Sequence, residues 1–175
     1  MKPFFAAAAA LWLALPVGAE TLQTSAGPMR ADAVVEGLRT PWAFGFLPDG
    51  TILVTERPGR LLAIRDGAGT EVHGLPDITE WGQGGLLDVL VPRDFATSRL
   101  LFFTYADVGL LGRDVATAVW RARLSDDGTQ LEDGQRIFAL DDYSRLGRHF
   151  GARLVEAPDG ALWFLSVGNG ALYRL

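Results

Sequence analysis

His149 is one of two histidines in this chain of 175 residues, and it stands between Gly147 and Gly151. An imidazole titrates near neutral pH, so it can remove a proton from a weak acid such as a sugar hydroxyl. Arg148 and Arg153 place positive charge beside it in the sequence. A lone histidine also commonly serves as a hydrogen-bonded structural residue, and the residues by themselves leave both interpretations open.

A second segment of chemical interest, residues 82–88, has the sequence GQGGLLD. Its small residues would let a flat ligand approach the backbone, and Gln83 offers both a hydrogen-bond donor and an acceptor. The segment fits neither the GxGxxG pattern nor a Walker loop, and it lacks the strand–helix context that phosphate binding needs. Taken by itself, the pattern favours a tight turn before a strand over a ligand site.

Other charged residues allow more than one role. Arg153 can bind an anionic cofactor or pair with a structural carboxylate. The acidic pairs at 126–127 and 141–142 suggest calcium ligands, but their spacing is unlike an EF-hand loop, which favours solvated loop carboxylates. His73 precedes a Gly-Leu-Pro run and is expected in a loop.

Charge and cysteine content exclude some classes of function. The chain has 16 basic and 21 acidic residues, and no basic run interleaved with aromatic residues. This balance argues against a nucleic-acid partner. Cysteine is absent, so the sequence holds no disulfide framework and no cysteine-based metal site.

Residues 1–19 have the pattern of a secretory signal peptide. Lys2 gives a positive start, residues 4–15 are apolar, and residues 17–19 are small. The apolar core is shorter than the roughly 20 residues that a membrane-spanning helix needs. We therefore predict export to the periplasm, with secretion as the alternative, and no membrane span after signal cleavage.

The remainder, residues 20–175, is predicted to be nearly all β. Short apolar stretches alternate with turn sequences such as PDG, DDG and GNG, and no stretch has a helical apolar period. Strands are expected at residues 42–46, 51–55, 60–64, 86–91, 100–105, 117–124, 137–140, 161–166 and 171–175. Residues 152–155, which follow the histidine, are also strand-like.

An internal repeat indicates the architecture. LPDGTILV at residues 47–54 is echoed by APDGALWF at residues 157–164, and a strand that begins after a glycine follows in both copies. Repeats of this size with several strands each are typical of β-propeller blades. The spacing predicts about three blades in this chain. An open sheet edge is then expected at the C-terminus, through which copies of the chain would self-associate.

At these residues the chain resembles the soluble quinoprotein sugar dehydrogenases, the glucose/sorbosone and aldose sugar dehydrogenase family. The resemblance extends in order over roughly residues 34–160. The segments that carry it are GL at 37–38, PWA at 41–43, FLPDG at 46–50, VTERPGRL at 54–61, GQGGLLD at 82–88, PRDF at 92–95 and HFGARL at 149–154.

The resemblance implies a six-bladed propeller that holds pyrroloquinoline quinone (PQQ) with the help of calcium. It implies oxidation of an aldose sugar at C1 to the lactone, with electrons passed on to an external acceptor. His149 would be the general base, and Gln83 would lie against the quinone. Arg153 is a candidate for the cofactor carboxylates. Some members have an aspartate before the histidine, where this chain has Arg148.

Length is the largest departure from the family pattern. Members continue for roughly another half of the protein, which carries the calcium ligands and the basic residues that hold PQQ. The resemblance thus indicates a truncated or internally deleted member, in which residues 161–175 resemble a closing blade, and we expect weak or no turnover from this chain alone. The alternatives are a non-catalytic propeller fragment that acts as a binding module or has no function, and a metal-dependent lactonase or sugar-acid hydrolase.

Overall fold

The computed structural model describes residues 20–109, 112, 114–141, 143 and 145–175, so the predicted signal peptide lies outside the described residues. The chain divides into two units, Met1–Glu36 and Gly37–Leu175. The described part of the first unit contains a hairpin of β1 (Glu20–Thr24) and β2 (Gly27–Ala31). The Thr24 hydroxyl stabilises its turn by donating to the Gly27 carbonyl at 2.7 Å.

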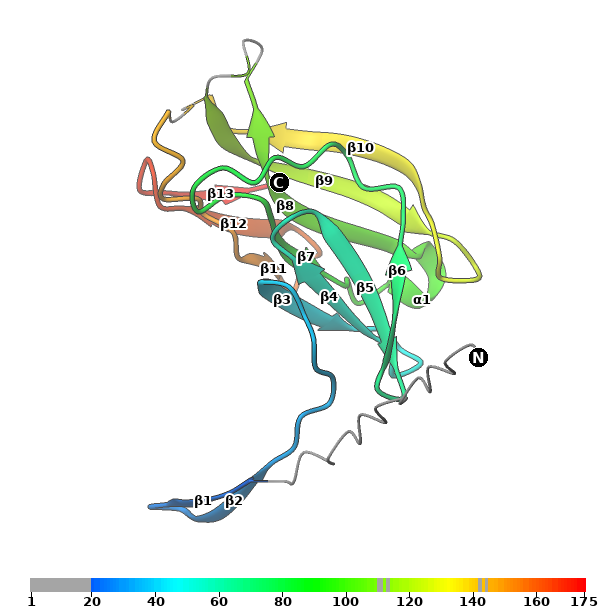
Figure 1. The fold of residues 1–175 in the computed structure, drawn as a ribbon. Helices are drawn as coiled ribbons and strands as arrows, with labels where there is room; N and C mark the ends of the chain where they lie inside the picture. The colour runs from blue at the N-terminus through cyan, green and yellow to red at the C-terminus, as the bar shows by residue number, and fades with distance from the viewer. Residues whose placement is uncertain (1–19, 110–111, 113, 142, 144) are drawn as a thin grey trace, which may run out of the picture. The chain divides into compact units, whose positions relative to one another are not determined.

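The described residues of the second unit form three antiparallel sheets, in each of which the strands follow one another in chain order (Figure 1). The first sheet contains β3 (Pro41–Phe46), β4 (Ile52–Glu56), β5 (Arg60–Arg65) and β6 (Ala68–Val72). The second contains β7 (Leu86–Leu90), β8 (Leu100–Val108), β9 (Val115–Leu124) and β10 (Leu131–Ala139), with the short helix α1 (Phe95–Ser98) between β7 and β8. The third contains β11 (Leu154–Glu156), β12 (Leu162–Ser166) and β13 (Ala171–Arg174).

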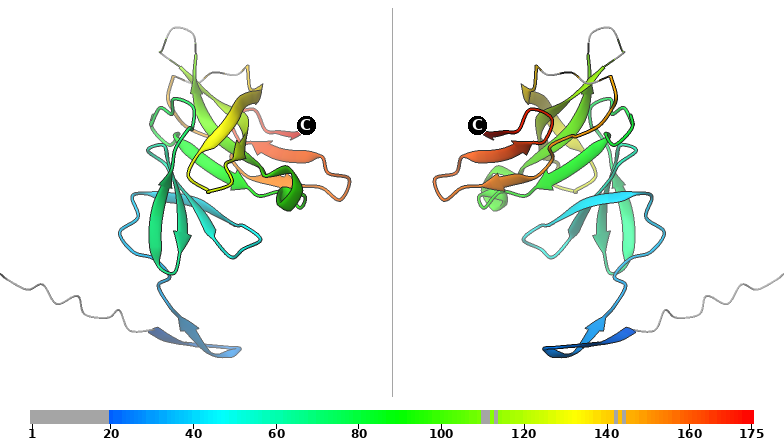
Figure 2. Two further views of the ribbon diagram at one scale, coloured as in Figure 1. Left: turned by 90° about the vertical axis from the view of Figure 1, so that its right-hand side faces the viewer. Right: turned by 90° about the vertical axis from the view of Figure 1, so that its left-hand side faces the viewer.

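The three sheets are arranged as successive blades of a propeller. The first strand of the middle sheet, β7, contacts the first strands of both neighbours, β3 and β11. Seen from the side, the sheets form separate layers, cyan to blue-green, green to yellow, and orange (Figure 2). The predicted all-β fold of about three blades is therefore confirmed.

Apolar side chains fill both spaces between neighbouring blades, which explains why the apolar stretches recur at blade spacing. Between the first two blades the core includes Leu53, Leu61, Leu86, Phe103 and Trp120. Between the second and third blades it includes Ala116, Val119, Leu140, Leu154 and Phe164.

The sequence repeat corresponds to two hairpin turns with the same hydrogen bonds, one between β3 and β4 and one between β11 and β12. In each turn the aspartate accepts a backbone N–H bond from two residues on, at 3.0 Å for Asp49 and 3.1 Å for Asp159. Gly50 and Gly160 have φ angles of +87° and +86°, which L side chains rarely adopt. The PDG pattern thus fixes equivalent turns in the first and third blades.

The outer faces of the first and third blades carry exposed apolar side chains. Phe44 and Phe46 on β3 are 63% and 61% exposed, beside the half-exposed Trp42. On the third sheet Leu165 and Leu172 are 54% and 59% exposed. The edge strand of this sheet is β13, where the sequence predicted an open edge.

Several strands differ from the predicted ranges. Strands β1, β2 and β6 were not predicted from the sequence, and β10 begins at Leu131 instead of residue 137. Most of the missed residues are polar or small and exposed, so they lack the apolar alternation on which strand prediction depends. The strand after the histidine motif begins at Leu154, two residues later than expected. No helix of the described residues is long and apolar enough to cross a membrane.

Candidate functional site

The glycines of the predicted ligand segment pack against protein backbone and side chains. A Cβ atom added at Gly82 would lie 2.4 Å from the carbonyl oxygen of Gly147, and one at Gly85 would lie 2.1 Å from the carbonyl oxygen of Arg57. At Gly84 it would lie 2.7 Å from the ring of Phe150. The small residues therefore allow a tight turn to pack between the segment around Arg57 and the histidine motif. A tight turn is the interpretation that the sequence pattern favoured.

Gln83 connects this turn to the histidine motif through two hydrogen bonds. Its backbone N–H donates to the carbonyl oxygen of Gly147 at 2.8 Å. Its side-chain Oε1 accepts a hydrogen bond from the backbone N–H of His149 at 3.0 Å. Two of the predicted site residues, 66 positions apart in the sequence, are thus brought into direct contact.

His149 adopts a left-handed backbone conformation with a φ of +63°. Such angles are uncommon for residues other than glycine, although histidine is one of the types enriched there. The side chain is exposed, and it lines a cleft of about 310 Å³ next to Tyr143, Arg145, Arg148 and Ser166. His149 is therefore an exposed residue in a cleft that is also lined by residues with hydroxyl and guanidinium groups.

Tyr143 contributes a titratable hydroxyl to this cleft. The hydroxyl donates to Oδ2 of Asp107 at 3.4 Å, and Arg136 pairs with the same carboxylate oxygen at 2.6 Å. Burial is the main cause that raises the pKa of Tyr143, and the charge of Asp107 adds to it. Tyr143 therefore stays a neutral hydrogen-bonding group near the histidine.

A second cleft, of about 500 Å³, lies beside the Gln83 turn. Its lining comprises Thr40, Trp42, Arg57, Gly82, Gln83 and Phe150. Phe150 lines both clefts, so the two clefts are neighbours. Trp42 and Arg57 were not predicted as site residues, although both lie within segments that carry the family resemblance.

Arg153 lies beside a structural carboxylate. Its Nη1 is 3.9 Å from Oδ1 of Asp88, which is 3% exposed, while the arginine side chain is 74% exposed. Oδ2 of Asp88 accepts a hydrogen bond from the backbone N–H of Leu154 at 2.6 Å. Arg153 is not among the described residues that line the two clefts. Of the two roles that the sequence left open for Arg153, this position favours pairing with a structural carboxylate. Binding of a cofactor by Arg153 stays a prediction.

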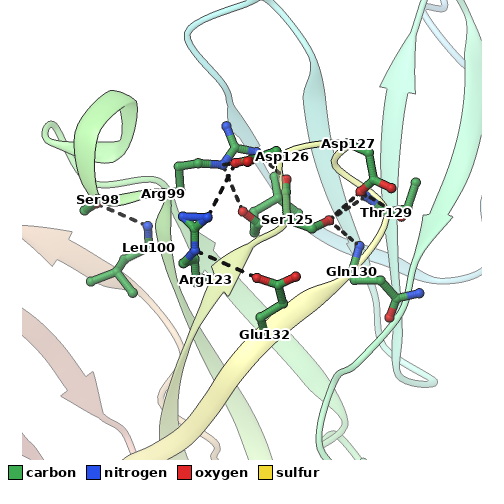
Figure 3. Close-up of polar contacts among 11 residues, drawn as sticks. Ser98, Arg99, Leu100, Arg123, Ser125, Asp126, Asp127, Thr129, Gln130 and Glu132 are labelled. Atoms are coloured by element: carbon green, nitrogen blue, oxygen red, sulfur yellow. Dashed lines mark hydrogen bonds and ion pairs between the residues drawn. The ribbon is translucent and has the colours of Figure 1, made fainter.

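The acidic pair at 126–127 takes part in a turn and in ion pairs (Figure 3). Oδ1 of Asp127 accepts hydrogen bonds from the hydroxyls of Ser125 and Thr129 at 2.6 and 2.9 Å. Asp126 pairs with both Arg99 and Arg123 at 3.4 Å. No group of three His, Cys, Asp or Glu side chains that could hold a metal is found among the described residues.

His73 lies outside the cleft that holds His149. Its backbone N–H donates to the Thr129 carbonyl at 3.0 Å, and its carbonyl accepts from the backbone N–H of Leu131 at 2.8 Å. It forms an isolated bridge with Gln130 instead of lying in a plain loop.

Comparison with known proteins gives consistent matches to sugar dehydrogenases. The family model described as Glucose / Sorbosone dehydrogenase matches residues 38–173. The aldose sugar dehydrogenase YliI of Escherichia coli is 38% identical over 173 residues, which are 97% of this chain and 43% of that protein. An uncharacterized protein of Synechocystis is 37% identical over 161 residues, which are 86% of this chain and 38% of that protein. The chain thus spans about two fifths of the length of these relatives.

Solved structures agree with this result. The apo-form crystal structure of the soluble aldose sugar dehydrogenase from Escherichia coli matches with a TM-score of 0.73 and 39% identity, covering 77% of this chain and 40% of that one. The PQQ-bound form of an aldose sugar dehydrogenase from Streptomyces coelicolor matches with a TM-score of 0.71 over 93% of this chain and 50% of that one. At 21% identity the second likeness shows the fold only. Because the family model matches most of the sequence, this chain belongs to the glucose/sorbosone dehydrogenase family.

Proposed function

We propose that this chain serves PQQ-dependent oxidation of aldose sugars at C1 to the lactone, with His149 as the general base. One observation carries the proposal. In a chain of the sugar dehydrogenase family, Gln83 holds the backbone of His149, and His149 is an exposed residue that lines a cleft. This is the arrangement that base catalysis needs, because the proton acceptor must be fixed and still reach the substrate.

The cleft beside Gln83 has side chains suited to PQQ, a flat quinone that carries carboxylates. Trp42 and Phe150 offer aromatic surfaces, and Gln83 offers an amide. PQQ, when bound, supplies an acceptor for the hydride that leaves the sugar C1. Arg145 and Arg148 add positive charge to the neighbouring cleft, which also contains His149.

His149 takes up the proton that the sugar loses. In the neutral imidazole one ring nitrogen has a free lone pair, and this nitrogen takes the proton of the C1 hydroxyl as the hydride leaves the same carbon. The loss of one proton and one hydride converts the cyclic sugar to its lactone. General base catalysis of this kind typically contributes about 10²–10⁴-fold to the rate.

We also propose that the protein is exported to the periplasm and passes its electrons to an external acceptor. Residues 1–19 support export by their signal-peptide pattern. We propose that calcium assists the binding of PQQ, and we assign no residue of this chain as a calcium ligand.

A PQQ titration followed by absorbance, with and without calcium, tests the proposal. We expect saturable binding that strengthens with calcium, and slow reduction of an artificial electron acceptor when glucose is added. An intact fold without PQQ binding would instead support the non-catalytic binding module. Calcium-dependent lactone hydrolysis without PQQ would support the hydrolase alternative.

A further inference from the structure

The Arg57 guanidinium makes one hydrogen bond and one ion pair with the turn that holds His149. Its Nη1 donates to the carbonyl oxygen of Gly82 at 2.5 Å, and its Nη2 pairs with Oε1 of Glu80 at 2.5 Å. The Arg57 side chain is 20% exposed, whereas that of Glu80 is 42% exposed. The Arg57 guanidinium, from the first blade, therefore binds the segment that precedes the second blade.

The carbonyl that Arg57 contacts belongs to the same peptide group as the N–H that contacts the histidine motif. The C=O of Gly82 accepts from Arg57, and the N–H of Gln83 in that peptide donates to the Gly147 carbonyl at 2.8 Å. A charged donor on the carbonyl polarises the peptide and strengthens the bond that its N–H makes. One peptide group thus links the guanidinium to the residues that precede His149.

Both the N–H and the carbonyl of Arg57 are hydrogen-bonded, so the backbone that carries its side chain is held in place. Its N–H donates to the Thr40 carbonyl at 3.1 Å, and its carbonyl accepts from the N–H of Leu86 at 2.9 Å. Held in this way, Arg57 fixes the turn from the side opposite to His149. The left-handed φ of His149 also requires external contacts, because that conformation costs free energy by itself.

We infer that Arg57 is a positioning residue for His149, acting through the Gly82–Gln83 peptide, with Glu80 orienting the guanidinium. As far as it concerns catalysis, this inference rests on the proposed function of His149. The physical link itself does not, so it can be tested without PQQ or sugar. Lysine cannot replace arginine fully, because its single ammonium lacks the planar fork that reaches a carboxylate and a carbonyl together.

The test measures hydrogen exchange at the backbone amide of His149, whose bond to Gln83 reports the position of the motif. The amide of His73, bonded to Thr129, is the internal reference. Arg93→Gln is the matched control, since Arg93 also contacts one carboxylate and one carbonyl, those of Glu156 and Ala157, away from the turn. For Arg57→Gln we expect exchange at His149 to rise at least about tenfold, the effect of losing a charged hydrogen bond, with His73 unchanged.

Arg57→Lys and Glu80→Gln should give intermediate increases at His149. The two histidines of the chain give separate imidazole NMR signals, and in Arg57→Gln only the signal of His149 should shift or broaden. Unchanged exchange at His149 in Arg57→Gln, or an equal increase in Arg93→Gln, would overturn the inference. If hydrogen exchange in Arg57→Gln is faster at His73 as well, Glu80→Gln becomes the deciding variant. The inference then requires that exchange in Glu80→Gln rises at His149 and not at His73.

Discussion

The side-chain oxygen of Gln83 accepts a hydrogen bond from the backbone N–H of His149 at 3.0 Å. The backbone N–H of the same glutamine donates to the Gly147 carbonyl at 2.8 Å, so Gln83 holds the histidine motif at two points. Both bonds use backbone groups of the histidine motif, and His149 itself is exposed and lines a cleft. Fixation of the backbone and accessibility of the base are thus achieved together.

Removing the side chain of Gln83 should loosen His149 and weaken PQQ binding. Gln83→Ala deletes the acceptor for the His149 N–H and an amide from the second cleft, and loss of such a bond costs about 0.5–1.5 kcal/mol. We expect the Kd for PQQ, measured by absorbance titration, to rise about tenfold or less. Gln135→Ala is the control, because Gln135 is exposed on β10 and bonds only to Arg121 among the described residues. Equal PQQ affinity in Gln83→Ala and wild type would contradict this assignment.

Gly147 is predicted to tolerate no side chain. It has a φ of +59°, and an added Cβ would lie 2.2 Å from Cδ1 of Trp81. Gly147→Ala should therefore lower the free energy of unfolding by about 3–5 kcal/mol, from backbone strain and overpacking together. At Gly160, with a φ of +86° and open space around it, alanine should cost only about 1–2 kcal/mol. Urea unfolding of the two variants checks this order, and similar losses would refute it.

Asp88 should make stability depend on pH. Burial raises the pKa of this carboxyl above its ordinary value of 3.8, against the opposing effects of the Leu154 N–H and Arg153. The folded state thus binds the proton more tightly than the unfolded state, so this group's contribution falls as pH rises from about 3.8 through the raised pKa. Asp88→Asn does not titrate and can still accept the Leu154 N–H. Its stability relative to wild type should therefore increase across that window and stay constant above it.

Asp88→Ala completes this test. It leaves the buried N–H of Leu154 without its acceptor and should be about 1–3 kcal/mol less stable than Asp88→Asn at every pH. The measurement is urea unfolding of the three proteins between about pH 4 and pH 8, the range in which the folded state is generally stable. A constant difference between Asp88→Asn and wild type over this range would contradict the raised pKa.

The uncovered apolar faces of the first and third blades predict self-association of this chain. Phe44 and Leu165 lie on these faces, and large exposed apolar patches commonly mark interaction surfaces. A Phe44→Ser/Leu165→Ser double variant should show a lower apparent mass than wild type by light scattering at equal concentration. Met29→Ser is the control, since Met29 is also exposed but belongs to the separate β1–β2 hairpin. A wild-type chain that stays monomeric at all concentrations would contradict the prediction.

The sequence predicted the parts of the fold whose patterns are local. The PDG turns and the apolar strands such as β4, β5 and β12 follow from alternation and turn chemistry. Strand β6 could not be predicted, because AGTEV has a small and polar composition and forms an exposed outer strand. Local pattern is informative only where one face of a strand is buried.

Two residues of the candidate site could be predicted from the sequence, but the bond between them could not. His149 and Gln83 could be singled out by residue type and by family resemblance. Their hydrogen bond could not, because it joins positions 66 residues apart that meet only when neighbouring blades pack. The glycines at 82, 84 and 85 suggested room for a ligand, whereas they make room for the carbonyl of Gly147, the ring of Phe150 and the carbonyl of Arg57.

The most direct test of the central claim is a single-turnover measurement on protein loaded with PQQ and calcium and mixed with excess glucose. The rate of the absorbance change on PQQ reduction is compared between wild type and His149→Ala at matched PQQ occupancy. If His149 is the general base, the variant should bind PQQ but reduce it about 10²–10⁴-fold more slowly. Reduction of PQQ by His149→Ala at the wild-type rate would contradict the role of His149.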